Sequence, residues 1–107
     1  MKTANDNWIR AYQARLAEEF ANSPQEFKDV VAAFKASASA AGEHERAVHH
    51  CKEGEEYIVG DNFERMAGCY VLRGGEWFFR DKWSGEDRPV KGGVAEVLAD
   101  ASIAYTG

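Results

Sequence analysis

The chain holds few of the residues that build specialised folds. It has 2 cysteines and 2 prolines among 107 residues, and no apolar run approaches the roughly 20 residues of a membrane-spanning helix. Two cysteines are too few for a disulfide scaffold or a four-thiolate zinc site. The first ten residues lack the apolar segment of a secretory signal peptide. These absences predict a cytoplasmic protein with no membrane partner.

Basic residues are scarce as well. The chain carries 13 Lys and Arg against 18 Asp and Glu, which gives a net charge of −5. Proteins that bind duplex DNA neutralise its phosphates with clustered basic side chains, so the composition argues against duplex DNA as a partner. What remains is an ordinary globular composition, with 45% hydrophobic and 29% charged residues. The length suits a single domain over residues 1–107.

The first part of the chain, residues 1–53, has the periodicity of helices. Residues 7–21 place apolar side chains at steps of three and four, which predicts a helix with one apolar stripe. The stripe consists of Trp8, Ile9, Tyr12, Leu16 and Phe20. A second stripe follows in residues 27–41, and its members are Phe27, Val30, Val31, Phe34, Ala38 and Ala41. We expect these two helices to form a helical hairpin.

The ends of the second helix are signalled by individual residues. Ser23 is a favourable cap, Pro24 suits the first helical position, and Glu26 lies at the position from which it can accept a hydrogen bond from the Ser23 amide. Gly42 is a plausible end. Residues 43–52 then predict a third, short helix.

The second part, residues 54–107, predicts β structure and a last helix. Residues 57–59 are expected to form a short strand. Residues 68–72 and 76–80 lie on either side of Gly74 and Gly75, and they are expected to form a β-hairpin. In this register Arg73 lies opposite Glu76, and the next opposed pairs are Leu72 with Trp77, Val71 with Phe78, and Tyr70 with Phe79. Residues 84–93 are expected to be a loop, and Val94, Val97, Leu98 and Ala101 predict a C-terminal amphipathic helix.

The predicted fold class is therefore α+β. We expect an N-terminal helical hairpin of two to three helices, packed on a small antiparallel sheet of about three strands, with a C-terminal helix. Both faces of the predicted β-hairpin are apolar near its turn. Either a helix covers each face, or one face is kept for a partner. A homodimer through an exposed sheet face is one such arrangement.

Histidine and cysteine lie close together in sequence, at His44, His49, His50 and Cys51. On a helix His44 and Cys51 would be roughly 10 Å apart, too far for a nucleophile–base pair. The group also lacks the spacing of helical zinc ligands, and there is no second cluster to complete a site. We expect no catalytic residue, no metal and no cofactor. Cys51 and Cys69 are expected to be buried free thiols.

Five acidic residues follow in a stretch that holds no base. They are Glu53, Glu55, Glu56, Asp61 and Glu64. General acid–base catalysis needs a carboxyl group in an apolar pocket, whereas these residues are interspersed with glycine and predicted to be exposed. They are interpreted as a solvated acidic edge or as an electrostatic contact for a basic partner.

Residues 77–88 hold the most suggestive composition. Four aromatic and three basic side chains fall within these twelve residues, and the candidate interaction surface is Trp77, Arg80, Lys82, Trp83 and Arg88. Charge is segregated too, because residues 1–64 carry 7 basic and 12 acidic side chains and residues 65–91 carry 6 and 4. The stretch fits the core of a sheet with charges on its rim, a protein interface, or a platform for single-stranded nucleic acid.

The function predicted from these features is a small, non-enzymatic protein-binding module that acts by surface docking on another protein. In type, though not in any motif, the chain resembles the small acidic proteins often encoded by phages and plasmids, among which anti-defence inhibitors, adaptors and immunity factors occur. A small ligand-binding domain or minor enzyme, with a pocket between helices and sheet, is the alternative. A binder of single-stranded nucleic acid is the third hypothesis.

Overall fold

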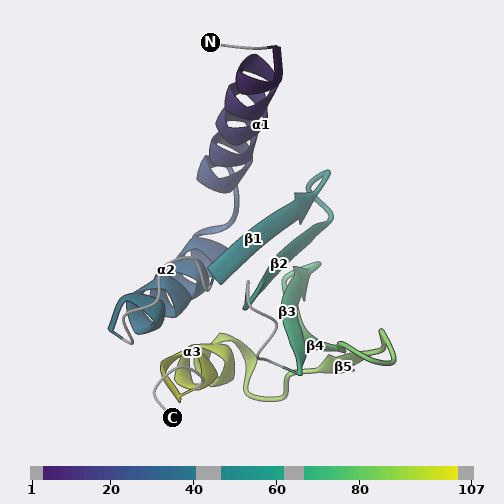
Figure 1. The fold of residues 1–107 in the computed structure, drawn as a ribbon. Helices are drawn as coiled ribbons and strands as arrows, with labels where there is room; N and C mark the ends of the chain where they lie inside the picture. The colour runs from purple at the N-terminus through teal and green to yellow at the C-terminus, as the bar shows by residue number, and fades with distance from the viewer. Residues whose placement is uncertain (1–3, 41–46, 62–66, 104–107) are drawn as a thin grey trace.

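The computed structural model describes residues 4–40, 47–61 and 67–103. This part of the chain forms an α+β fold with three helices and one five-stranded antiparallel sheet (Figure 1). The elements in chain order are α1 (Ala4–Ala21), α2 (Gln25–Ala40), β1 (Ala47–Lys52), β2 (Glu56–Asp61), β3 (Gly68–Arg73), β4 (Glu76–Asp81), β5 (Asp87–Pro89) and α3 (Gly93–Ile103). Each strand pairs with the next one along the chain, in the order β1-β2-β3-β4-β5.

The hairpin between β3 and β4 has the predicted register. Arg73 lies opposite Glu76, and the further pairs run back to Gly68 opposite Asp81. The two turn residues, Gly74 and Gly75, have φ angles of 61° and 81°. A two-residue turn with positive φ at both positions matches the twist of the flanking strands, and only glycine adopts it without steric cost.

Two strands occupy segments for which the sequence predicts other structures. Residues 43–52 were expected to be helical, yet Ala47–Lys52 is strand β1, with His49 opposite Val59 of β2; residues 43–46 lie outside the described part of the chain. The predicted loop 84–93 contains the short strand β5, in which Arg88 lies opposite Phe79. Ladder hydrogen bonds to a neighbouring strand outweigh the weak local preferences of both segments. The sheet therefore has five strands, where about three were predicted.

One face of the sheet carries the hydrophobic core. Helices α2 and α3 lie side by side over this face (Figure 1). The core consists of fully buried and nearly buried side chains from all these layers, namely Phe27, Val30, Val31, Phe34, Ala47, Val59, Tyr70, Leu72, Trp77 and Val97. The described part of the second apolar stripe is thus buried as predicted, while the side chains of Ala38 and Ala41 lie outside the described residues.

Helix α1 does not form the predicted helical hairpin with α2. It runs away from the sheet and meets α2 end to end (Figure 1). Only its last turns contact the body, where Phe20 packs against Phe27 and His49 with ring centroids 6.2 and 4.6 Å apart. Helices α2 and α3 pack on the core face of the sheet, and α1 meets this face at its C-terminal end, where Phe20 lies against His49.

The start of α2 also differs in detail from the prediction. The Ser23 amide donates to the carbonyl of Phe20, and the Ser23 hydroxyl hydrogen bonds the same carbonyl. Glu26 therefore does not close the predicted capping box. The first carbonyl to accept a helical hydrogen bond is that of Pro24, from the amide of Lys28 at 3.1 Å. The predicted Gly42 end lies outside the described residues.

Candidate functional site

The outer face of the sheet, opposite the helices, is covered by an ion-pair network. Arg80 contacts Glu56 and Asp87, each at 2.7 Å, and Arg73 contacts Asp87 at 3.0 Å and Glu56 at 3.4 Å. The guanidinium of Arg73 also lies 4.6 Å from the ring centroid of Phe78. Hydrogen bonds from Arg80 lower the pKa of both carboxyl groups, and the same bonds raise the pKa of Arg80.

The network determines how this face of the sheet is covered. Val71 points to the outer face, where the described structure places no helix, and is nonetheless fully buried. It lies between Ile58 of β2 and Phe78 of β4, its cross-strand neighbours. Among the described residues no helix covers the outer face, and the charged side chains of Glu56, Arg73, Arg80 and Asp87 pair with one another on it.

The predicted interaction surface is divided among four places. Trp77 is 3% exposed in the core, where its indole donates to Glu26. Arg80 is held in the outer-face network, and Arg88 lies on the helix-side face with its guanidinium 5.9 Å from the ring centroid of Phe79. Lys82 and Trp83 are the two members that lie together and exposed, in the turn after β4.

That turn is well ordered by hydrogen bonds. Asp81 accepts the backbone amides of Trp83 and Ser84 at 2.8 and 3.0 Å, and these bonds lower the pKa of its carboxyl group. The indole of Trp83 is 77% exposed, with the Lys82 ammonium 5.4 Å from its ring centroid. Trp83 therefore remains accessible to a partner, in a fixed loop.

The predicted acidic edge is also dispersed. Glu53 and Glu55 are exposed in the turn between β1 and β2, where Glu53 has a φ angle of 50°. Glu56 belongs to the outer-face network. Asp61 ends β2, its side chain lies outside the described residues, and so does the whole of Glu64.

The described histidine and cysteine positions are divided between the two faces of the sheet. His44 lies outside the described residues. Cys51 shares the helix-side face with Tyr57, whereas Cys69 lies opposite Arg80 on the outer face, so the two thiols are separated by the sheet. Both are free and half-buried. Burial raises the pKa of the Cys69 thiol, which favours the unreactive protonated form.

His49 joins α1 to the sheet. Its imidazole hydrogen bonds the backbone carbonyl of Leu16, and its Nε2 atom is buried with no partner among the described residues. Burial lowers the pKa of His49, because the protonated ring would leave a charge against Phe20 and Phe27.

The feature that sequence reasoning missed is the exposure of the first half of α1. Trp8, Ile9 and Tyr12 are 67%, 43% and 40% exposed. They lie on the same stripe as Leu16 and Phe20, which contact the body, so one apolar face is half covered and half free. The periodicity reveals the stripe, but it contains no signal that distinguishes its covered end from its free end.

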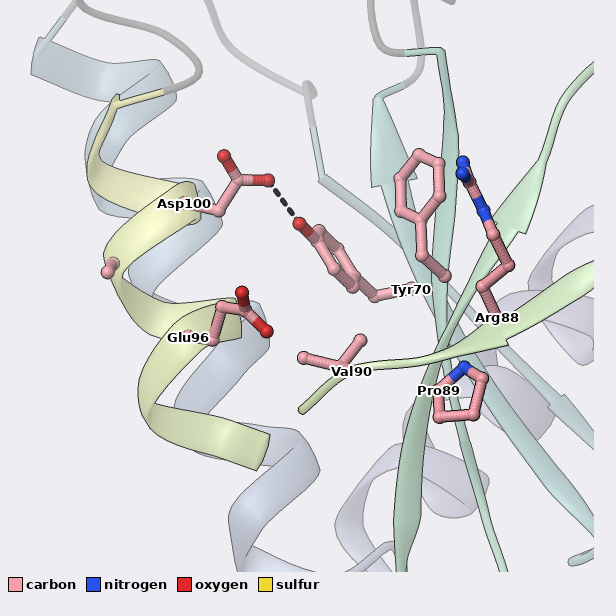
Figure 2. Close-up of a pocket in the computed structure, with 8 residues that line it drawn as sticks. Tyr70, Arg88, Pro89, Val90, Glu96 and Asp100 are labelled. Carbon is pink, nitrogen blue, oxygen red and sulfur yellow. Dashed lines mark hydrogen bonds between the residues drawn. The ribbon is translucent and has the colours of Figure 1, made fainter. Parts of the chain in front are cut away.

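A pocket of about 500 Å³ lies between α3 and the sheet. Its sheet wall is formed by Tyr70 and Phe79, and its helix wall by Glu96, Ala99 and Asp100. Residues 88–90 close the third side (Figure 2). The Tyr70 hydroxyl donates to Asp100, and burial together with this bond raises the pKa of Tyr70.

Within the described ranges, no group of three or more His, Cys, Asp or Glu side chains is arranged to hold a metal ion. Nor does any helix in those ranges have the length and apolar character needed to cross a membrane.

Comparison with protein-family models, with curated proteins and with solved structures finds no match to this chain. The function proposed below therefore depends on the geometry and chemistry of the chain's own residues.

Proposed function

We propose that this protein is a small, cytoplasmic, non-enzymatic protein-binding module, such as an inhibitor, adaptor or immunity factor. It docks by inserting the apolar face of α1 into an apolar groove with an acidic rim on another protein. The observation that carries the proposal is the exposure of Trp8, Ile9 and Tyr12 on a helix that projects from the body.

The exposed face has the composition of an interface anchor. Trp8 and Tyr12 are one turn apart and stack with ring centroids 5.7 Å apart and an interplanar angle of 12°. Aromatic side chains bury roughly 150–250 Å² each and dominate the energy of many interfaces. Helices that bind in grooves use anchors spaced three or four residues apart on one face, which is the spacing of Trp8, Ile9 and Tyr12.

Charge defines the rim of the groove. Residues 7–17 contain Arg10 and Arg15 and no acidic residue, although the whole chain has a net charge of −5. Arg15 lies beside the apolar face, with its guanidinium 5.4 Å from the ring centroid of Tyr12. A partner with carboxylates around an apolar groove would complement both the apolar face and the positive charge of this segment.

The arrangement gives less support to the hypothesis of a binder of single-stranded nucleic acid. A platform for single-stranded nucleic acid would need Trp77 exposed and Arg80 available to phosphate, whereas Trp77 is buried and Arg80 is engaged by two carboxylates. Trp83 with Lys82 is the remaining accessible aromatic site from the predicted surface, and it serves below as the competing docking point.

Site-specific photo-crosslinking tests the proposal. A benzophenone amino acid replaces Tyr12 in one protein and Ala14 in a control, because Ala14 is exposed on the opposite side of α1. Both proteins are irradiated in the native host, and the partner crosslinked from position 12 and not from position 14 is identified and purified. Its affinity is then measured for the wild type, for Trp8→Ala with Tyr12→Ala, and for Trp83→Ala with Arg80→Glu.

The proposal expects the α1 double variant to lose at least tenfold in affinity, since each buried aromatic anchor contributes about 2 kcal/mol or more. Circular dichroism should show that the variant keeps its fold, because both side chains are exposed. Three outcomes would contradict it: equal crosslinking from both positions, loss of binding only in the Trp83 variant, or crosslinking of the chain to a second copy of itself.

A further inference from the structure

We propose that the pocket between α3 and the sheet binds a small zwitterionic molecule, with a protonated amine near Glu96 and Asp100 and an anionic group near Arg88. This site is separate from the α1 face, and it adds a ligand to the proposed docking function.

The pocket combines an aromatic wall with opposite charges on its two sides. Tyr70 and Phe79 lie on adjacent strands with ring centroids 5.2 Å apart at an interplanar angle of 68°. Glu96 and Asp100 reach into the pocket from α3, and Arg88 lies across from them on β5 (Figure 2). At about 500 Å³ the pocket falls within the range that holds small molecules in proteins.

The two carboxylates are suited to an amine. They are four residues apart, so they share one face of α3. Glu96 accepts the amide of Gly92 at 3.2 Å, and Asp100 accepts the Tyr70 hydroxyl. These bonds orient the two groups, and each carboxylate retains further acceptor positions. The faces of Tyr70 and Phe79 would favour a cation beside them.

Arg88 supplies the complementary anchor. Its side chain is 69% exposed, and its ion pair with Asp81 is long, at 3.9 Å. The guanidinium lies over Phe79 at 5.9 Å from the ring centroid, at the pocket wall. An incoming carboxylate or phosphate can meet it with two parallel hydrogen bonds, which a loosely held arginine forms at little cost.

Three probes that share one benzene ring test the two charges of the ligand separately. They are 4-(aminomethyl)benzoate, benzylamine and benzoate, titrated against ¹⁵N-labelled wild-type protein and followed by chemical-shift changes. The zwitterion should perturb the amides around Tyr70, Phe79 and α3, and it should bind at least about tenfold more tightly than benzylamine, because it gains a second charge-assisted contact.

Variants that each remove one charged side chain then assign the two ends of the ligand. Arg88→Gln should bring the affinity for the zwitterion down to that for benzylamine and leave benzylamine binding unchanged, while Glu96→Gln should weaken both by at least about fivefold. Lys82→Gln and Glu86→Gln make the same charge changes outside the pocket and should have less than about a twofold effect.

Several results would overturn the assignment. These are no binding of any probe at millimolar concentration, shifts centred away from the pocket, a zwitterion that binds no more tightly than benzylamine, or control variants that weaken binding as much as the pocket variants do. Since all four substituted side chains are exposed, the folded spectrum should persist in every variant.

Discussion

Trp77 of β4 donates its indole hydrogen to the carboxylate of Glu26 in the first turn of α2, with 2.5 Å between Nε1 and Oε1. The two residues are 51 positions apart in the chain. The indole is buried, so its polar atom needs a partner, and Glu26 provides one at the helix end where a negative charge is most favourable. This contact fixes α2 on the sheet.

Removing the donor should therefore be costly. Trp77→Phe keeps an aromatic ring in the core and leaves the Glu26 carboxylate without its partner, so we expect a loss of about 1–3 kcal/mol in the free energy of unfolding. Urea denaturation followed by circular dichroism measures it. Trp83→Phe is the matched control, since Trp83 is exposed and should change stability by less than about 0.5 kcal/mol. Equal losses of unfolding free energy in both variants would show that the indole hydrogen bond contributes nothing to stability.

The outer-face network should make stability fall in acid. Hydrogen bonds from Arg80 lower the pKa values of Glu56 and Asp87 from their ordinary values of 4.5 and 3.8. A lowered pKa in the folded state stabilises the fold above the ordinary pKa, and this stabilisation is lost as the pH falls through the folded-state value. We expect Asp87→Asn to flatten the decline of the urea midpoint below about pH 4. Glu86→Gln, at an exposed neighbour, should leave the decline as steep as in the wild type.

His49 should confer a second pH dependence, nearer neutrality. Burial lowers its pKa from 6.5, and the groups that act on it electrostatically are Lys35, His50 and Glu19. Below pH 6.5 the unfolded chain therefore binds a proton at His49 more readily than the folded chain does. The stabilisation that this histidine provides is complete above pH 6.5 and is lost as the pH falls through the folded-state pKa. His49→Gln should reduce the difference between urea midpoints at neutral and at mildly acidic pH, whereas His50→Gln, at an exposed position, should not. An unchanged difference in the His49 variant would refute this role.

The thiol of Cys69 should react slowly. Burial raises its pKa, and alkylating agents attack only the thiolate. With iodoacetamide at about pH 8, we expect Cys69 in the folded protein to be modified several-fold more slowly than in protein unfolded by urea, as measured by peptide mass spectrometry. A faster reaction in the folded state would indicate an activated thiol and would support the enzyme hypothesis. Cys51 and Cys69 should also fail to form a disulfide under oxidation, because they lie on opposite faces of the sheet.

Several elements of the fold were predictable because their signals are local. The register from Arg73 opposite Glu76 onward follows from a two-glycine turn, which leaves no freedom in how the strands pair. The buried stripe of α2 follows from helical spacing. Residues 47–52 and Asp87–Pro89 were predicted wrongly for the opposite reason, since each becomes a strand through hydrogen bonds to a neighbour that the local sequence does not specify.

The candidate site was less accessible to prediction. Trp77 and Trp83 belong to one aromatic and basic stretch, yet one is in the core and the other is exposed. Strand alternation places Trp77 on the helix-side face, while Trp83 lies beyond the strand in a turn. Arg80 and Glu56 were assigned to different surfaces, and the sheet brings them to 2.7 Å. Such pairings depend on which strands are neighbours.

By itself, then, the sequence determined the acidic net charge, the apolar stripes of the helices and the register of the central hairpin, because turn chemistry and side-chain periodicity act within a few residues. Tertiary structure alone decided which end of the α1 stripe is covered, that ion pairs shield the outer face, and that Glu96 and Asp100 oppose Arg88 across a pocket. Burial and electrostatic pairing depend on distances between residues far apart in the chain, and only the folded arrangement sets those distances.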